Sequence, residues 1–269
     1  MSKDPATAPM SVVLPFYNEQ AFLPASLACL AAQTVRPLKL ILVDNASSDG
    51  STAVARQCLQ GTSGIKTVFL QEPRPGKCAA LQTGLKAVDT PFVALCDADT
   101  AYPPHYLAQA LQLFEAGGAD LVACLAMGVS QAPTRWRAQL KRRKGVMMST
   151  LFPRHCHTGG YGFVLRTQAL RQAGGYDPDA WPFTLMDHEQ MARIFKLGRG
   201  QYHPDLWCQP SARRADRSSV RWTLPERLLY QALPFAAHDW FFHRFLARRF
   251  RARRLQGTAL REQPWRRAR

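Results

Sequence analysis

Asp97 and Asp99 are separated by one residue and come directly after an apolar run, residues 93–96. A short apolar run bounded by polar residues predicts a buried strand, so both carboxylates should lie at the end of that strand. Mg²⁺ binds one or two carboxylates and leaves its other positions to water and to the phosphates of a substrate. The pair therefore predicts a site for a hard divalent cation such as Mg²⁺ with a phosphorylated ligand, although such pairs also occur by chance on protein surfaces.

Two further polar clusters each follow a short apolar run. Residues 15–19 (PFYNE) end the run that begins at Ser11, and residues 44–50 (DNASSDG) follow the run 38–43. Taken alone, each cluster could equally be an ordinary turn or helix cap, because turns are rich in Asn, Asp, Ser and Gly. In parallel sheets, however, ligands bind at the carboxyl ends of the strands, so the clusters should converge with the aspartate pair. Their convergence is what predicts a ligand site.

Apolar runs alternate with helical patterns through the first half of the chain. The expected strands are residues 11–15, 38–43, 66–70, 91–96 and 121–125, and the expected helices are about 19–33, from about 50, 77–88 and 106–116. This alternation is typical of an α/β fold in which a mostly parallel, Rossmann-like sheet carries helices on both faces. The chain has neither Gly-x-Gly-x-x-Gly nor a P-loop, which argues against a dinucleotide or P-loop site.

Charge is distributed unevenly along the 269 residues, which are 46% hydrophobic and carry a net charge of +16. Residues 1–130 hold 8 basic and 10 acidic residues, whereas residues 131–269 hold 27 basic and 9 acidic ones. The apolar content excludes a wholly disordered chain, and the neutral first half argues against a protein that only coats nucleic acid. The second half predicts an anionic partner.

The seven cysteines are spread along the chain without a Cys-x-x-Cys pair, so we expect reduced thiols and a cytoplasmic setting. The cluster at residues 155–157 (HCH) lacks a second ligand pair at the spacing of a structural zinc site. The first nine residues have no apolar core of a secretory signal, and no apolar run reaches the length of about 18 that spans a membrane.

Two basic segments account for the charge of the second half. Residues 135–154 hold seven basic residues and no acidic one, and residues 241–269 hold ten arginines and one glutamate. Aromatic residues are mixed with the second set, including Trp240, Phe241, Phe242, Phe245 and Phe250. We favour an interfacial helix on anionic lipid at the inner face of the cytoplasmic membrane. RNA binding, which we rank lower, and a solvated basic tail without a partner remain open. A chain ending at Leu233 should then keep its nucleotide site and lose binding to anionic vesicles.

In order and spacing, the polar segments resemble those of family 2 glycosyltransferases with the GT-A fold. The resemblance covers about residues 9–210 and is carried by residues 15–19 (PFYNE), 43–51 (VDNASSDGS), 74–84 (RPGKCAALQTG), 97–99 (DAD), 158–162 (TGGYG), 174–177 (GGYD) and 186–198. It implies a nucleotide-diphosphate sugar as donor, with UDP the usual nucleotide, and transfer with inversion to an acceptor hydroxyl or phosphate. The acceptor could be a lipid-linked glycan, a polyprenyl phosphate or a small molecule, and we favour a lipid-linked or envelope glycan.

The resemblance also assigns roles to individual residues. Asp99 would bind Mg²⁺ or Mn²⁺ directly, and Asp97 would lie near the ribose or the metal. Asp44 would bind the base, and Arg74 and Lys77 the diphosphate. Asp187 would be the general base, with Glu189 a weaker candidate. The residues assigned to the nucleotide sugar are Pro15, Tyr17, Glu19, Asp44, Asn45, Ser47, Arg74, Lys77, Asp97, Ala98 and Asp99. Those assigned to the acceptor side are Gly159, Gly160, Tyr161, Glu189, Arg221 and Trp222.

Two departures from the family pattern qualify this assignment. Met186 stands where the family usually has an acid before Asp187, and residues 218–222 (SSVRW) lack the glutamine of processive members. Chain-elongating synthesis is therefore not expected. We expect a GT-A domain over residues 1–215 and a basic, aromatic-rich helical extension over 216–269. The alternative from another class is a catalytically inactive GT-A fold that serves as a basic membrane- or RNA-binding adaptor.

Overall fold

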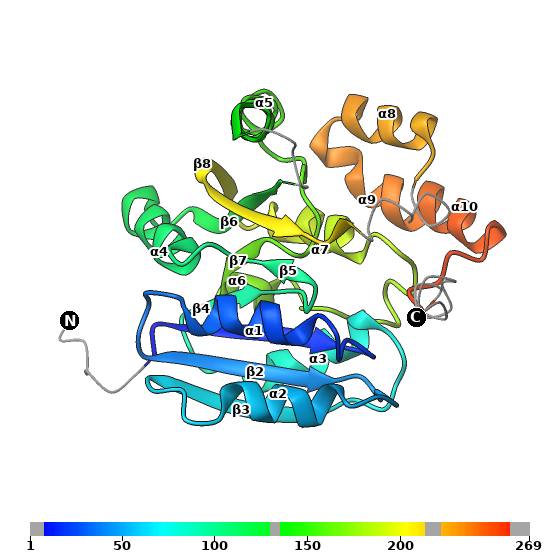
Figure 1. Ribbon diagram of the computed structural model, residues 1–269. Coiled ribbons are helices and arrows are strands. Elements are labelled where there is room, and N and C mark those ends of the chain that lie inside the picture. Colours follow the sequence, from blue (N-terminus) through cyan, green and yellow to red (C-terminus); the bar gives the residue numbers. More distant parts are fainter. Residues whose placement is uncertain (1–7, 130–134, 213–221, 259–269) are drawn as a thin grey trace.

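The computed structural model describes residues 8–129, 135–212 and 222–258, and is built around one mixed eight-stranded sheet (Figure 1). Its strand order is β3-β2-β1-β4-β7-β6-β8-β5. The strands are β1 (Met10–Phe16), β2 (Leu38–Asp44), β3 (Ile65–Gln71), β4 (Phe92–Leu95), β5 (Thr100–Ala101), β6 (Leu121–Gly128), β7 (Phe163–Arg166) and β8 (Arg199–Pro210). Strands β1 to β4 are parallel to one another, and β7 runs antiparallel between β4 and β6.

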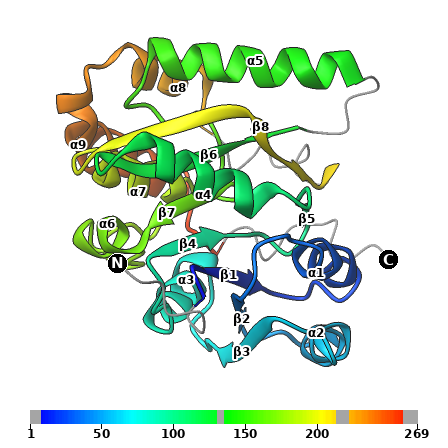
Figure 2. The same cartoon turned by 90° about the vertical axis from the view of Figure 1, so that its left-hand side faces the viewer.

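The helices cover both faces of this sheet (Figure 2). The helices α1 to α7 belong to the sheet domain: α1 (Leu23–Ala31), α2 (Ser51–Leu59), α3 (Lys77–Lys86), α4 (Tyr106–Gly117), α5 (Arg135–Leu151), α6 (Thr167–Gln172) and α7 (Met186–Ile194). Three more follow in the extension: α8 (Leu224–Ala232), α9 (His238–Trp240) and α10 (Ala247–Ala252). A 3-10 turn η3 (Phe235–Ala237) and a π-helical turn η4 (Phe241–Leu246) connect the last of them.

The side chains of β1 point alternately to the two faces of the sheet, and this explains why two cores form. Val12 and Leu14 belong to the core beneath α1, α2 and α4, whereas Val13 belongs to the core beneath α3, α6 and α7. Successive side chains of a strand point to opposite faces, so a continuously apolar strand such as β1 must be covered on both. The sequence-based prediction of an α/β sheet with helices on both faces is confirmed, and each predicted element of the first half is present.

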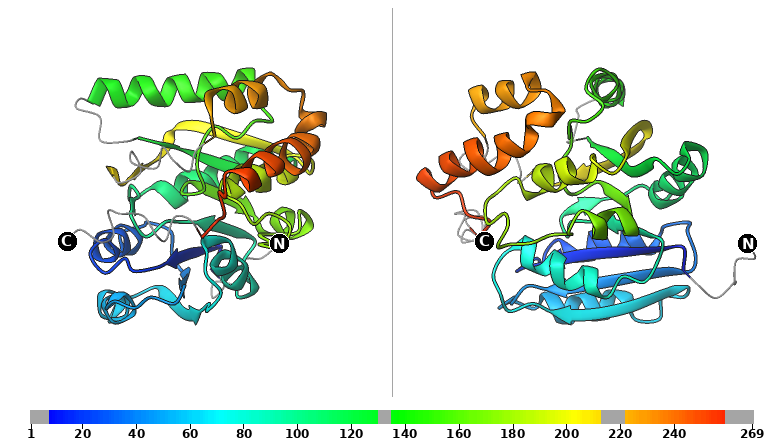
Figure 3. Two further views of the ribbon diagram at one scale, coloured as in Figure 1. Left: turned by 90° about the vertical axis from the view of Figure 1, so that its right-hand side faces the viewer. Right: turned by 180° about the vertical axis from the view of Figure 1, so that it is seen from behind.

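Residues 222–258 pack against α7 rather than extending away from the sheet (Figure 3). Phe241, Phe242 and Phe250 are fully buried and form a third core with Trp181 and Phe183. The expectation that these rings are available to a membrane is therefore wrong, because they already bury their apolar surface inside the protein. Within the described residues, no helix combines the length and the apolarity needed to cross a bilayer.

A short strap closes this extension onto the sheet domain. The amide of Thr184 donates to the carbonyl of Leu255 at 3.0 Å, and the amide of Gly257 donates to the carbonyl of Pro182 at 2.8 Å. Phe183 and Gln256 form an isolated antiparallel bridge between these two bonds. The strap brings Gly257 to the edge of the site described next.

Candidate active site

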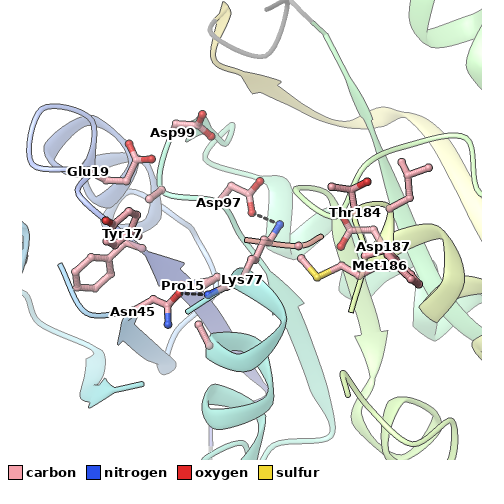
Figure 4. Close-up of a pocket in the computed structure, with 17 residues that line it drawn as sticks. Pro15, Tyr17, Glu19, Asn45, Lys77, Asp97, Asp99, Thr184, Met186 and Asp187 are labelled. Atoms are coloured by element: carbon pink, nitrogen blue, oxygen red, sulfur yellow. Dashed lines mark hydrogen bonds and ion pairs between the residues drawn. The ribbon is translucent and has the colours of Figure 1, made fainter. Parts of the chain in front are cut away.

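A cavity of about 190 Å³ lies at the carboxyl ends of β1 and β4 (Figure 4). On one side it is lined by the segments after these strands and by the start of α3, and on the other by residues 183–187. The lining residues expected from the sequence are Pro15, Tyr17, Glu19, Asn45, Lys77, Asp97, Ala98, Asp99 and Asp187. The polar clusters therefore converge at the carboxyl edge of the sheet, as parallel-sheet geometry requires.

Asp187 is held on the α7 side of the cavity by two hydrogen bonds. The amide of Gly160 donates to its Oδ2 at 3.0 Å, and the hydroxyl of Tyr176 lies 3.3 Å from its Oδ1. Burial raises the pKa of Tyr176 well above its usual value, so its hydroxyl stays protonated and acts as the donor. Leu185, just before α7, adopts a left-handed conformation (φ 62°) that residues with a β-carbon seldom take. These contacts fix the direction of the carboxylate.

The turn that carries Asp97 and Asp99 is fixed from beneath by two buried hydroxyls. The amide of Asp97 donates to the Tyr102 hydroxyl at 2.8 Å, and that hydroxyl donates to the Tyr161 carbonyl at 2.9 Å. The Ser26 hydroxyl donates to the Ala98 carbonyl at 2.7 Å. Tyr161 therefore supports this turn through its backbone carbonyl. Its ring lies so close to Gly159 that a β-carbon at residue 159 would be 2.7 Å from it.

Lys77 begins α3 and lies 2.6 Å from Asp97, measured from Nζ to Oδ1. Its position follows from the preceding loop, in which Gly76 has φ 118°, a conformation that favours glycine. The side chain of Asn45 holds this loop by accepting from the Gly76 amide at 2.9 Å and donating to the Arg74 carbonyl at 2.7 Å. Asn45 lines the cavity and also positions Lys77.

Arg74, expected beside the diphosphate, lies on the outside of the same loop. Its guanidinium pairs with Glu72 at 2.9 Å and contacts Gln82 at 3.0 Å. Hydrogen bonds from Arg74 and Thr83 outweigh burial and hold the pKa of Glu72 at about 2. Arg74 does not line the cavity, because its charge is used to neutralise a buried carboxylate.

Asp44 and Ser47, also expected to contact the nucleotide, shape the turn after β2. Asp44 Oδ1 accepts from the Ser47 amide at 2.8 Å, and its Oδ2 accepts from the Thr52 hydroxyl at 2.7 Å. The Ser47 hydroxyl in turn accepts from the Asn18 amide at 3.1 Å, which ties this turn to the end of β1. Neither residue lines the cavity.

Glu189 faces away from the cavity. Its buried carboxylate pairs with Arg193 at 2.8 Å and lies 3.4 Å from the imidazole of His243. Burial alone would raise its pKa, but the hydrogen bonds from His243 and Arg193 outweigh this and lower it. Glu189 therefore holds the extension against α7, and the structure gives it no direct access to an acceptor.

Trp222, also assigned to the acceptor side, is the first described residue of the extension. Trp222 packs against His188 and Tyr230, with ring centroids 4.9 Å away in each case. Arg221 lies outside the described residues. Several lining residues have no local sequence signal, because long-range packing places them: Phe183, Thr184, Leu185 and Gly257.

The donor atoms at the cavity fit a hard divalent cation that arrives with a substrate. The described residues contain no cluster of three or more His, Cys, Asp or Glu side chains able to hold a metal by themselves. Asp97 and Asp99 nevertheless both line the cavity, and two carboxylates suffice where substrate phosphates supply further ligands. The side chains present therefore fit Mg²⁺ or Mn²⁺ bound together with a diphosphate.

Comparison with known proteins identifies the family. The model of the family described as "Glycosyl transferase family 2" matches residues 11–174, more than half of the chain. The chain belongs to glycosyl transferase family 2. An uncharacterized glycosyltransferase of Mycobacterium tuberculosis is 34% identical over 181 residues, which cover 66% of this chain and 77% of that protein. The expectation of a glycosyltransferase enzyme is thereby confirmed.

A second relative is the undecaprenyl-phosphate 4-deoxy-4-formamido-L-arabinose transferase of Aeromonas hydrophila, 32% identical over 163 residues. The match covers 58% of this glycosyltransferase and about half, 48%, of the Aeromonas protein.

Two solved structures share the fold. The mannosyltransferase PcManGT of Pyrobaculum calidifontis, in complex with GDP-Man and Mn²⁺, has a TM-score of 0.66 at 20% identity and covers 89% of this chain and 72% of its own. S. aureus TarS 1–349 in complex with UDP-GlcNAc has a TM-score of 0.58 at 18% identity, and the match covers 96% of this chain and 77% of the TarS chain. The expected GT-A fold is confirmed.

Proposed function

We propose that this glycosyltransferase moves a sugar from a UDP-sugar to a lipid-linked acceptor, polyprenyl phosphate or a glycan built on it. One observation carries the proposal: Asp187 lies across a single cavity from Lys77 and the Asp97–Asp99 turn. A base on one side and a phosphate-binding side on the other is the arrangement that a single in-line displacement needs. The Aeromonas relative is named for undecaprenyl phosphate, which supports this class of acceptor.

The roles of the side chains follow from their positions. Asp187, oriented by Gly160 and Tyr176, would take the proton from an acceptor hydroxyl as that oxygen attacks the anomeric carbon. The attack on the face opposite the leaving nucleotide inverts the anomeric carbon. Lys77 would place a fixed positive charge beside the departing diphosphate, where negative charge increases.

Asp99, with Asp97, would hold Mg²⁺ or Mn²⁺ when the donor is bound, and the cation would neutralise charge on the two phosphates. PcManGT, which has the same fold, was solved with GDP-Man and Mn²⁺. The protein would reach a lipid acceptor by binding peripherally to the cytoplasmic face of a membrane. The chain then acts where the isoprenoid phosphate is exposed to water.

The test is a panel of nucleotide sugars, each incubated with Mn²⁺ and a short-chain polyprenyl phosphate, with release of nucleoside diphosphate as the readout. Release with one donor, lost in excess chelator and in Asp99→Asn, supports the proposal. The matched control is Asp205→Asn, a carboxylate on β8 that does not line the cavity and should have full activity. Binding of nucleotide sugars without any transfer would favour the inactive adaptor instead. Full activity of Asp99→Asn in chelator would overturn the metal assignment.

A further inference from the structure

Most of the large apolar side chains that remain exposed are gathered on two helices. Among the described residues, six of the eight large hydrophobic side chains with the highest exposure lie on α5 and α8: Trp136, Leu140, Met147, Leu151, Leu224 and Leu228. All six are between 54% and 70% exposed. Single exposed apolar residues are ordinary, whereas a contiguous set marks an interaction surface.

On α5 the four residues form a stripe opposite the face that packs on the protein. At about 100° per residue, Trp136, Leu140, Met147 and Leu151 fall within about 60° of one another around the helix axis. Val146 and Gly145, on the opposite side, face the core, where a β-carbon at Gly145 would overlap Met127. Arg142, on the same inner side, stacks on Trp207 with 5.3 Å from Cζ to the ring. The stripe therefore points away from β8.

Helix α8 repeats this arrangement over a shorter length. Tyr230 and Glu226 are buried, and Glu226 pairs with Arg249 at 2.6 Å. Leu224 and Leu228 lie one turn apart on the opposite side of the helix and are exposed. In Figure 1, α5 and α8 both lie at the top of the molecule, with β8 below α5 and α9 below α8. Figure 3 shows the two helices along the same edge in two further views.

The charges beside the α5 stripe are all positive. Arg143 lies on one side of the stripe, and Arg137 and Lys144 lie on the other; all three are exposed. The helix sequence, residues 135–151, contains no acidic residue. An apolar stripe with basic flanks is the pattern of a helix that lies in the interface of an anionic bilayer.

We propose that the exposed faces of α5 and α8 form the surface with which this protein docks on a membrane containing anionic phospholipid. This inference rests on the proposed function, which places the protein at a membrane, and it names the surface that makes the contact. A second copy of the chain fits the surface poorly, because an isologous contact would bring the basic flanks of α5 against themselves. RNA fits poorly because the stripe offers one aromatic ring and three aliphatic side chains, whereas stacking needs several rings.

Sedimentation of the full chain with vesicles tests the proposal. Vesicles of phosphatidylcholine containing phosphatidylglycerol should bind the chain, whereas vesicles of phosphatidylcholine alone should bind it weakly. The variant with W136Q, L140Q, M147Q and L151Q should lose binding by roughly tenfold or more, because the apolar contact is removed. The matched control replaces two exposed apolar residues elsewhere, Leu197→Gln and Trp240→Gln, and should bind like the wild type.

A second pair of variants locates the charges. Arg143→Gln with Lys144→Gln should weaken binding at low salt by roughly fivefold for each residue, the factor that corresponds to about 1 kcal/mol. Arg248→Gln with Arg251→Gln, in the arginine-rich extension, should leave binding unchanged.

Four results would overturn the proposal. The thermal midpoint of the stripe variant is measured with that of the control, and equal midpoints show that a change in vesicle binding does not come from unfolding. Wild-type binding by the stripe variant, or loss of binding only in the extension variant, contradicts the assignment. A wild-type dimer in solution that the stripe variant abolishes, or preferential binding to RNA with a steep dependence on salt, contradicts it as well. Release of nucleotide is also measured for the stripe variant with acceptor dissolved in detergent. Normal release there shows that the proposed function holds even if the membrane-docking proposal fails.

Discussion

The backbone amide of Gly160 donates a hydrogen bond to the carboxylate of Asp187, with 3.0 Å between N and Oδ2. The two residues are 27 positions apart, and the contact joins the segment before β7 to the first turn of α7. A β-carbon at residue 160 would overlap this carboxylate. Glycine is therefore required here by the space that Asp187 occupies.

Gly160→Ala should displace Asp187 and reduce transfer by about 10²-fold, the cost of a misplacement of about 1 Å in a catalytic group. Binding of the nucleotide should change little, because the phosphate-binding residues lie across the cavity. The kcat and the dissociation constant of UDP are measured in parallel. Gly257→Ala is the control in the same cavity, since its β-carbon would make only an ordinary contact, 3.5 Å from the Pro182 carbonyl. Equal losses in both variants would show that Gly160 has no special relation to Asp187.

Asp187→Asn separates proton transfer from positioning. With a hydroxyl acceptor, we expect transfer to fall by about 10²–10⁴-fold while donor binding is retained, as for loss of a general base. A phosphate monoester acceptor, with a second pKa of about 6, is already ionised at pH 7.5 and needs no base, so the loss should be much smaller. Comparing the two acceptor classes with one donor therefore tests whether Asp187 acts by removing a proton from the acceptor. Collapse of donor binding in this variant would instead make Asp187 a structural residue.

The first half of the fold could be predicted because its signals are local. Each strand of the parallel region is a short apolar run, and the ends of β1, β2 and β4 carry the polar clusters. The direction of individual side chains could not be predicted in this way. Arg74 and Lys77 are three residues apart in one loop, yet Arg74 pairs with Glu72 outside the cavity and Lys77 pairs with Asp97 inside it.

The second half was harder to predict because its structure depends on distant partners. Nothing near Phe241 or Phe250 in the sequence indicates that Trp181 and Phe183 will cover them. The mixture of arginine and aromatic residues therefore suggested an interfacial helix, while the exposed apolar stripe lies on α5. The position of Glu189 could not be predicted either, because one of its partners, His243, lies far away in the extension; the other, Arg193, is on α7.

Lys77 and Arg74 allow a direct test of the charge beside the diphosphate. Lys77→Gln should weaken binding of UDP by about 1.5–3 kcal/mol, the contribution of a hydrogen bond to a charged group. Arg74→Gln should affect affinity much less and should lower the thermal midpoint, because it leaves Glu72 partly buried without its cation. Calorimetric titration with UDP and thermal unfolding give the two readouts. The reverse ranking of affinities would place Arg74, and not Lys77, at the phosphates.

Truncation tests whether the extension is part of the folded unit. A chain ending at Leu233 should aggregate and lose UDP binding, because it exposes Trp181 and Phe183 and removes the strap at Leu255. This is the opposite of the expectation from the sequence. A chain ending at Thr258 should keep the midpoint and UDP affinity of the full chain, which makes it the control. Cooperative unfolding and normal affinity of the chain ending at Leu233 would show that the third core is dispensable.

The final prediction concerns pH and a group of buried histidines between the sheet domain and the extension. His238 packs on Tyr230 and His155, with ring centroids 4.9 and 4.7 Å away, and neither of its ring nitrogens has a hydrogen-bond partner among the described residues. Burial lowers the pKa of His238, and that of His188, to about 4. Both histidines are therefore neutral in the folded protein near pH 7.

In the unfolded chain these histidines titrate near pH 6.5, so between about pH 6.5 and 4 the unfolded state binds more protons than the folded state. The free energy of unfolding should fall as the pH falls through this window, by up to about 1.4 kcal/mol per pH unit for each histidine. His238→Phe, which keeps the ring and removes the titrating group, should be as stable as the wild type at pH 7.5 and more stable at pH 5. His105→Gln, on an exposed histidine, should leave the slope unchanged. Denaturant titrations at the two pH values measure the effect, and an identical slope in wild type and His238→Phe would show that His238 does not carry it.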